Sequence, residues 1–396
     1  MANRLYYQDP LRMEFDAAVT AVTRLEDRPA VTLDATAFYP ASGGQPFDTG
    51  TLGEARVVEV VESETGDVWH VLDRELAPGR RVHGIVDRDR RFDHMQQHTG
   101  QHILSAAFDR LHHARTVGFH LGALVSSLDL LLDLPADGIA AAEAEANRIV
   151  WEDRPVAIRF VSSDDAAALP LRKESERSGI LRLIDVEGYD LSACGGTHVT
   201  RTGAIGLITV LSAERLRGGI RLEFVCGGRA LRSFRLFRDT VAGCIRHLSV
   251  APDELPGALE RLQADSKDQR KAIKDLQERL AGFEAAALAA AAEEVNGVRQ
   301  VVQALEGRDQ NELKAMALSI CSAPGFRAAL FSTTSPYVAV MARSKDGRGD
   351  CAAALKALIA AFGGRGGGRP EMAQCGGLAG DLSQILAAAR AEFARQ

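Results

Sequence analysis

The sequence predicts an α+β protein made of four consecutive segments. These are a small N-terminal β-barrel over residues 1–90, an α+β domain over 91–250, a long helical or coiled-coil linker over 251–297 and a C-terminal α/β domain over 298–396. Short β-rich runs separated by turn residues predict the first segment. Two histidine-bearing motifs mark the second, and a heptad pattern of apolar residues marks the third. At 396 residues the chain is too long for one compact core.

The barrel segment alternates strand-like runs with turn signals. Runs such as "AVTLDATAFYP" and "ARVVEVVES" are rich in β-branched and aromatic residues, and turn sequences such as "EDRP" and "ETGD" separate them. Within "FYPASGGQPFDTG", residues 38–50, the sequence "SGGQP" demands a tight turn with positive φ and exposes backbone N–H groups. From this pattern alone, a plain hairpin loop is the simpler interpretation.

The second segment opens with a helix. The run "RRFDHMQQHTGQHILSAAFDRLH" has apolar residues at a spacing of three and four and carries His94, His98 and His102 on adjoining faces. Strand-like and helical runs then alternate as far as "GGIRLEFVCGG", with the motif "CGGTHV" at residues 194–199 between them. This order predicts an α+β domain.

Two pairs of potential metal ligands lie far apart in this domain. His98 and His102 are four residues apart on the predicted helix, so they share one face at a separation of about 6 Å. Cys194 and His198 repeat the same spacing and would complete a tetrahedral N/S set of the kind that zinc accepts. Cys194 as a buried thiol and His198 as a core histidine is the alternative interpretation. The residues also leave open whether an ion there would be structural or catalytic.

The third segment predicts a long amphipathic helix or a coiled coil. Eight of the ten residues at its a and d heptad positions are apolar, and charged residues flank them. The a positions are Leu259, Ser266, Ile273, Leu280 and Ala287, and the d positions are Leu262, Gln269, Leu276, Phe283 and Ala290. A single helix packed on its own domain is the alternative.

The C-terminal segment contains strand-like runs, an alanine-rich helix and the run "GGRGGGRPEMAQCGG", residues 363–377. So many glycines predict a loop whose backbone approaches a ligand closely, with Arg365 and Arg369 as donors to an anion.

Composition limits the classes of function. The net charge of −6 provides no global attraction to nucleic acid, so any such contact must come from local basic patches. The six cysteines form no C-x-x-C pair, which favours a reducing compartment over a disulfide scaffold. No apolar run reaches the roughly 18 residues of a membrane span, and no secretory signal is present. We therefore expect a cytoplasmic protein without a membrane partner.

Five motifs together resemble a known family. The sequences "TAFYPASGGQPFDTG", "HMQQHTGQHILS", "CGGTHV", "GGIRLEFVCGGRA" and "GGRGGGRPEMAQCGG" occur in the order found in AlaX proteins of the long type. Those proteins are freestanding relatives of the editing domain of alanyl-tRNA synthetase that also carry its C-terminal, DHH-associated domain. The resemblance runs from about residue 5 to 396. Ser42 departs from it, because many relatives have a third glycine there, and Cys375 interrupts the usual glycine run.

The resemblance implies specific site residues. The family's zinc ligands correspond to His98, His102, Cys194 and His198, with one zinc ion per chain. Thr36 corresponds to the threonine thought to contact the serine hydroxyl of the substrate, and Gln45 to the glutamine that lines the editing pocket. The resemblance identifies no catalytic residue.

The implied activity is hydrolysis of the ester in tRNA(Ala) that carries the wrong amino acid, chiefly serine and conceivably glycine. This would make the protein an aminoacyl-tRNA deacylase, a carboxylic ester hydrolase acting in protein biosynthesis. The C-terminal domain would bind tRNA, and it or the coiled coil could form a homodimer. Editing of another mischarged tRNA, as in a threonyl-type system, is one alternative. A non-catalytic, zinc-stabilised tRNA-binding module is another.

Overall fold

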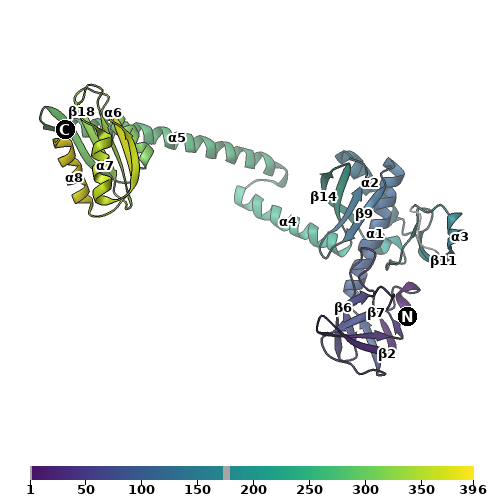
Figure 1. Ribbon diagram of the computed structural model, residues 1–396. Coiled ribbons are helices and arrows are strands. Elements are labelled where there is room, and N and C mark those ends of the chain that lie inside the picture. Colours follow the sequence, from purple (N-terminus) through teal and green to yellow (C-terminus); the bar gives the residue numbers. More distant parts are fainter. Residues whose placement is uncertain (1, 173–178) are drawn as a thin grey trace. The chain divides into compact units, whose positions relative to one another are not determined.

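The computed structural model describes residues 2–172 and 179–396, and the chain divides into two compact units, 1–244 and 245–396. Figure 1 shows the order of the elements along the chain. None of the helices in the described ranges is both long and apolar enough to cross a bilayer.

A closed six-stranded antiparallel barrel occupies the N-terminal part of the first unit, so the predicted barrel is confirmed. Its strands follow the order β2-β3-β7-β6-β5-β8. Alternate residues of β2, namely Phe15, Ala17 and Val19, point into the barrel core, as the period of two predicts. The bounds are β2 Glu14–Leu25, β3 Arg28–Leu33, β5 Gly50–Leu52, β6 Ala55–Glu62, β7 Val68–Leu72 and β8 Arg81–Val86. A short parallel pair, β1 (Asn3–Arg4) with β4 (Ala35–Thr36), lies outside the barrel.

The helix predicted to carry the histidines is α1, Arg88–His112. Asp87 caps its N-terminus by accepting from the backbone N–H groups of residues 89 and 90, and His113 ends it in the left-handed region at φ 52°. Almost every residue from 94 to 108 is buried, because a second helix and an antiparallel sheet, β14-β15-β10-β9, share a core with α1. These elements are α2 Ala136–Trp151, β9 Thr116–Leu121, β10 Ser126–Leu130, β14 Ile208–Leu216 and β15 Gly219–Cys226.

A three-stranded antiparallel sheet, β11-β12-β13, leads the chain to the second ligand pair. Its last strand, β13, ends at Ala193, and Cys194 follows directly. The remaining elements of the unit lie around this sheet and after β15. The bounds are β11 Val156–Ser162, α3 Ser163–Ala167, β12 Ile180–Val186, β13 Asp190–Ala193, η2 Thr202–Ile205 and α4 Gly228–Leu248, which continues into the second unit.

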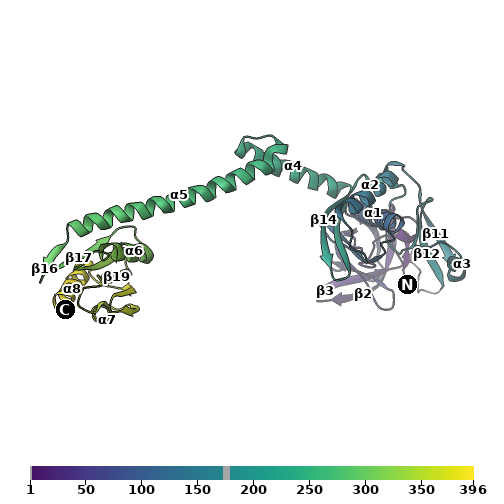
Figure 2. The same cartoon turned by 90° about the horizontal axis from the view of Figure 1, so that it is seen from above.

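The second unit contains a six-stranded mixed sheet in the order β16-β17-β18-β19-β21-β20. The end of α5 and α6 share one hydrophobic core with this sheet, and α7 and α8 share another (Figure 2). The C-terminal part therefore combines helices with a mixed, mainly antiparallel sheet. Its elements are η3 Pro252–Glu254, α5 Leu255–Ala290, β16 Glu293–Val295, β17 Val298–Leu305, α6 Gln310–Ile320, β18 Phe326–Ser332, β19 Tyr337–Arg343, α7 Cys351–Phe362, β20 Arg365–Arg369, β21 Met372–Leu378 and α8 Leu382–Ala394.

The heptad segment forms one 36-residue helix, α5. Ala281 and Ala285 near its C-terminal end pack against the sheet domain. Most large apolar side chains at the predicted a and d positions are exposed, from Leu259 at 46% to Phe283 at 71%. The long helix is thus confirmed, whereas a coiled-coil partner for its apolar face stays a prediction.

The prediction of a loop over the glycine-rich run is wrong. Residues 365–369 form the edge strand β20, which pairs with β21. A Cβ atom added at Gly366 would lie 2.2 Å from the backbone oxygen of Gln374 and 2.4 Å from Cβ of Cys375, so glycine is needed for close approach of the two strands. Cys375 itself is buried in the domain core.

A fully buried ion pair joins the barrel to α1. The guanidinium of Arg91 donates from Nε to both carboxylate oxygens of Asp48 at 3.1 Å, and it also donates to the carbonyl oxygens of Pro10 and Ala37. Asp48 in turn accepts from the backbone N–H of Tyr39 at 2.6 Å. Both charged side chains are 0% exposed, so each depends on the other for its stability in the interior.

Replacing Asp48 by Asn should therefore lower the free energy of unfolding by about 3–5 kcal/mol, because the Arg91 charge would stay buried without its counter-ion. Urea denaturation followed by circular dichroism measures this. The matched control is Glu75→Gln, which breaks an exposed pair with Arg24 and should cost less than about 1 kcal/mol. Equal costs for the two variants would contradict the structural role of Asp48.

Candidate metal centre

The two ligand pairs meet in one place. His98, His102, Cys194 and His198 each offer one ligand atom, and these four atoms all lie within 4.8 Å of one another. Sγ of Cys194 is 3.4 Å from Nε2 of His98 and 3.3 Å from Nε2 of His198. In a tetrahedron with Zn–N bonds of about 2.0–2.1 Å and Zn–S bonds of about 2.3 Å, neighbouring ligand atoms are about 3.3–3.8 Å apart. The four residues therefore fit one tetrahedral metal ion.

Each histidine of the centre is oriented by an oxygen acceptor on its other ring nitrogen. Nδ1 of His98 lies 2.8 Å from Oε1 of Gln45, and Nδ1 of His102 lies 3.1 Å from Oδ2 of Asp190. Nδ1 of His198 lies 3.2 Å from Oγ1 of Thr99. This is the arrangement that usually orients metal-ligating histidines, with one nitrogen on the metal and the other donating to oxygen.

The partners of these acceptors establish the histidine tautomers. The Thr99 hydroxyl donates to the carbonyl oxygen of Met95 at 2.9 Å, so its oxygen must accept from His198. The amide nitrogen of Gln45 donates to the Thr197 hydroxyl at 2.9 Å, and its oxygen also accepts from the Thr197 backbone N–H at 3.0 Å. An ionised carboxylate such as that of Asp190 can only accept. All three Nδ1 atoms therefore carry a proton, and Nε2 is the atom of each ring that faces the ion.

The electrostatics of the centre favour a metal-binding thiolate. Burial alone would raise the pKa of the Cys194 thiol, but the interactions with His98, His198 and His102 together outweigh burial and hold that pKa well below its usual value. Burial lowers the pKa of His198 to about 3, which keeps its imidazole neutral. Burial would also lower the pKa of His102, but the interactions with Asp190 and Cys194 together outweigh it and raise the pKa to about 9. A bound ion must displace this last proton from His102.

Local backbone geometry explains the glycines near the centre. Gly43 and Gly44 lie in the left-handed region at φ 54° and 79°, and Ser42 and Gln45 exchange backbone hydrogen bonds of 3.0 and 3.1 Å across this turn. The turn directs Gln45 toward His98. A Cβ atom added at Gly196 would lie 2.2 Å from Cε1 of His98, so the "CGGTH" loop can approach the ring only with glycine there.

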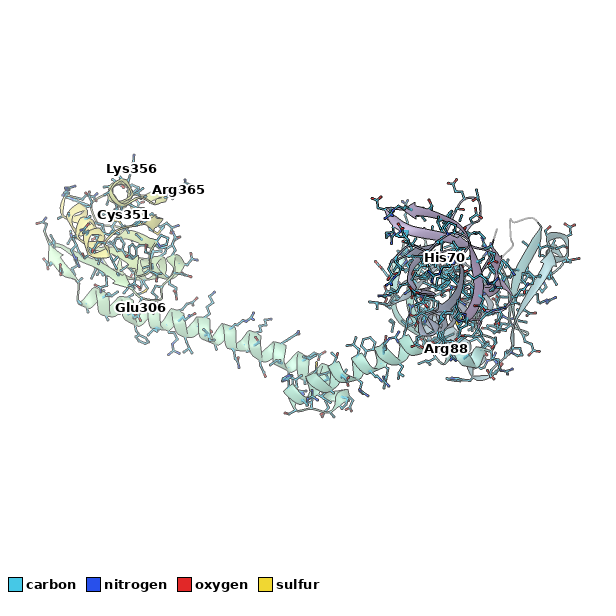
Figure 3. The ribbon with its side chains drawn as sticks, turned by 90° about the horizontal axis from the view of Figure 1, so that it is seen from below. His70, Arg88, Glu306, Cys351, Lys356 and Arg365 are labelled. Atoms are coloured by element: carbon cyan, nitrogen blue, oxygen red, sulfur yellow. The ribbon has the colours of Figure 1, made fainter. Side chains whose placement is uncertain are left out.

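Thr36 and Gln45, the two predicted substrate contacts, lie in different surroundings. Gln45 is buried beside the ligand set and orients His98, a role that the sequence prediction did not include. Thr36 is 0% exposed, and its Oγ1 lies 2.8 Å from Nε2 of His70 and 3.1 Å from the backbone nitrogen of Phe38. Figure 3 shows His70 inside the barrel. Contact of either residue with a substrate stays a prediction.

The predicted anion-binding arginines lie in the second unit. Arg365 and Arg369 are the first and last residues of β20, and both are exposed. Figure 3 shows Arg365 at the surface of this unit. Sequence reasoning missed three residues of the metal centre, namely Thr99, Asp190 and Thr197. Thr99 and Thr197 stand next to ligands inside the quoted motifs, so a search for oxygen acceptors beside each histidine could have found them. Asp190 carries no comparable signal.

Comparison with known proteins finds matches in both units of the chain. The family described as "Threonyl and Alanyl tRNA synthetase second additional domain" matches residues 181–222, and the DHHA1 domain matches residues 297–395. Alanine–tRNA ligases of Methanothrix thermoacetophila, Methanoculleus marisnigri and Pyrococcus furiosus are 34%, 35% and 35% identical over 94%, 94% and 76% of this chain. The chain spans 42%, 41% and 34% of those proteins. The solved C-Ala domain of Aquifex aeolicus alanyl-tRNA synthetase matches 26% of this chain and 97% of its own, with 19% identity and a TM-score of 0.25.

We expect the purified protein to bind one equivalent of zinc, and Cys194→Ala to lose most of it because one of four ligands is removed. Asp190→Asn should keep the ligands but weaken zinc binding about 10- to 100-fold, because an amide oxygen orients His102 less firmly. Elemental analysis and competition with a chelator measure both effects.

Cys244→Ala is the matched control, since that thiol is exposed and outside the ligand set. Undiminished zinc in Cys194→Ala would rule out the proposed ligand set.

Proposed function

The chain is a homologue of the portion of alanyl-tRNA synthetase that joins the second additional domain to the DHHA1 domain, as long AlaX proteins do, and from this relationship we propose that it deacylates mischarged tRNA. The substrate would be tRNA(Ala) esterified with serine, and glycine would be a second candidate. The observation that carries the proposal is the buried three-histidine, one-cysteine centre beside the Gln45 turn. Zinc is the ion that this set of ligands suits best.

The need for such a reaction follows from the limits of molecular recognition. An apolar pocket built for alanine rejects an analogue with an added hydroxyl by only about 10²-fold, so a second site must read the hydroxyl positively. In the proposed reaction, water adds to the carbonyl carbon of the aminoacyl ester. The bond from that carbon to the ribose oxygen breaks, and the ribose oxygen takes up a proton. The products are the free amino acid and uncharged tRNA.

The ligand set indicates a positioning role for the metal. His98, His102, Cys194 and His198 would hold the zinc ion, which can polarise a carbonyl group as a Lewis acid when it is bound. Four protein ligands resemble a closed site more than an open catalytic one. Gln45 and Asp190 keep the ligand rings in place, so these side chains act on the reaction through the histidines.

Thr36 is suited to accept a hydrogen bond from a serine hydroxyl. Nδ1 of His70 lies 3.2 Å from the carbonyl oxygen of Val31, which can only accept, so Nδ1 carries the proton and Nε2 accepts. Burial lowers the pKa of His70 to about 4, which keeps the ring neutral at pH 7. The Thr36 hydroxyl therefore donates to His70 and keeps its lone pairs for acceptance. One of them is used by the Phe38 N–H, and the other would read the substrate.

The test of the function is hydrolysis of a panel of charged tRNAs by the metal-loaded protein. Ser-tRNA(Ala) should be cleaved, whereas correctly charged Ala-tRNA(Ala) should be spared. Ser-tRNA(Thr) belongs in the panel, because the family that matches residues 181–222 includes threonyl-tRNA synthetases. Preferential cleavage of Ser-tRNA(Thr) would favour the threonyl-type alternative. Binding without cleavage of any substrate would favour a non-catalytic module.

Thr36→Val removes the hydroxyl with little change of shape and should lower cleavage of Ser-tRNA(Ala) about 10- to 100-fold. Activity on Gly-tRNA(Ala) should change much less, since glycine has no hydroxyl to read. The ratio of kcat/KM for the two substrates measures the effect.

Thr36→Ser keeps the hydroxyl and is the matched control, which should retain the ratio of the unmodified protein. Equal losses on both substrates in Thr36→Val, together with a lower melting temperature, would assign Thr36 to the stability of the barrel.

We also propose that β20 contacts tRNA through Arg365 and Arg369. All five residues of this edge strand are exposed, and the net charge of −6 requires a local basic site for RNA. Replacing both arginines by alanine should weaken tRNA binding and reduce the slope of log K against log salt by up to about 1.8, the value for two lost phosphate contacts. Removal of residues 251–396 should likewise raise KM and leave the cleavage step nearly unchanged.

Arg395→Ala is the control for the arginine pair. This arginine is also exposed in the second unit, but it already pairs with Glu392. An unchanged salt slope in the double variant would exclude β20 as the tRNA contact.

A further inference from the structure

A polar cleft of about 270 Å³ lies in the first unit, beside the metal centre but separate from its ligands. It is formed by the first turns of α1 and α4 and by the residues that follow the Gly43–Gly44 turn. Its lining includes Pro46, Asp89, Arg90, Asp93, His94, Arg229 and Arg232. A cleft of this volume has room for more than a single phosphate group.

The cleft and the metal centre share two structural elements. Pro46 lines the cleft, and the preceding Gln45 orients the ligand His98. On α1, His94 lines the cleft and stands four residues before His98, which corresponds to a rise of about 6 Å along the helix. A chain molecule whose end reaches the metal centre could therefore have its preceding unit in the cleft.

The charges around the cleft leave one arginine available for an anion. Asp93 is already neutralised, because Nε of Arg229 lies 3.0 and 2.9 Å from its two oxygens and Nη2 lies 2.6 Å from one of them. Arg232 approaches the same carboxylate only to 3.6 Å, and its side chain is 68% exposed. With Arg90 and the exposed Asp89 included, three arginines oppose two aspartates. The cleft thus carries a net positive charge of one.

His94 contributes to the same cleft a polar ring whose hydrogen bonding is incomplete. Its residue is 3% exposed, and its Nδ1 finds no hydrogen-bond partner among the described residues. Burial lowers the pKa of His94 to about 4, so the ring is neutral at pH 7 and offers one donor and one acceptor. A buried polar atom without a partner is unfavourable. A ligand with hydroxyl groups could complete the hydrogen bonding of this ring.

We propose that the cleft binds the phosphodiester-linked ribonucleotide that precedes the esterified nucleotide at the tRNA 3′ end. Arg232 would hold the phosphate, since the guanidinium fork matches phosphate oxygens, and His94 would contact a ribose hydroxyl. This inference rests on the proposed function, because it assumes that the RNA terminus reaches the metal centre.

The test measures binding of the uncharged RNA trinucleotide CCA to the full-length, metal-loaded protein by fluorescence anisotropy at several salt concentrations. Arg232→Ala should weaken binding about three- to tenfold and reduce the salt slope by about 0.7, the value for one phosphate of a single strand. Arg235→Ala is the matched control, because this arginine lies three residues further along α4, is exposed, and does not line the cleft. Equal losses for the two variants, or no loss for Arg232→Ala, would overturn the proposal.

His94→Phe should also weaken CCA binding, but it should leave the salt slope unchanged, since the imidazole is neutral. Its zinc content must equal that of the unmodified protein. If the zinc content of His94→Phe differs, the result of Arg232→Ala alone tests the proposal. Free inorganic phosphate at millimolar concentration should compete poorly with CCA. Strong competition would identify a site for phosphate alone and would overturn the proposal that the cleft binds a ribonucleotide.

The outcome is separable from that of the proposed function, because CCA binding requires no hydrolysis. If the variants alter CCA binding as expected but no charged tRNA is cleaved, the proposal that the cleft binds a ribonucleotide is supported and the deacylase proposal fails. If Ser-tRNA(Ala) is cleaved and Arg232→Ala binds CCA normally, the deacylase proposal is supported and the proposal that the cleft binds a ribonucleotide is wrong.

Discussion

The first unit depends on one constraint: three imidazoles must all present Nε2 to the same point. This requires a proton on each Nδ1 and an oxygen to accept it. The three acceptors come from a turn of the barrel segment, from α1 itself and from strand β13, namely Gln45, Thr99 and Asp190. The geometry of the centre is therefore a property of the whole unit, because a shift of any of these elements would release one ring and one potential metal ligand.

The buried pair of Arg91 and Asp48 maintains this alignment. Asp48 follows the Gly43–Gly44 turn by four residues, and Arg91 precedes the ligand His98 by two helical turns. The pair thus connects the segment that carries Gln45 to the helix that carries two ligands. Because neither charge has access to water, the two side chains cannot separate without a large cost in free energy.

The two units face opposite electrostatic problems. At the metal centre of the first unit, burial opposes ionisation, and only close partners keep the Cys194 thiol acidic and Asp190 ionised, with the pKa of Asp190 at about 2. In the second, Arg365 and Arg369 remain in solvent at the edge of a sheet, where their charges are fully available. A chain with a net charge of −6 can attract RNA only through such local groups, and we propose β20 and the cleft beside α4 for this role.

Spacing along the chain was sufficient to predict the two ligand pairs, the helix α1, the barrel and the long helix α5, because each depends on a local period of two, 3.6 or seven residues. The tertiary structure alone decided the rest. Asp190 reaches His102 across 88 residues, and only the pairing of β12 with β13 brings it there. The run "RGGGR" looked like a loop because its glycines have no side chains to signal a strand. The close approach of β21 requires these glycines. Contact with a partner strand leaves no pattern in the sequence of the run itself, so the sequence alone could not reveal it.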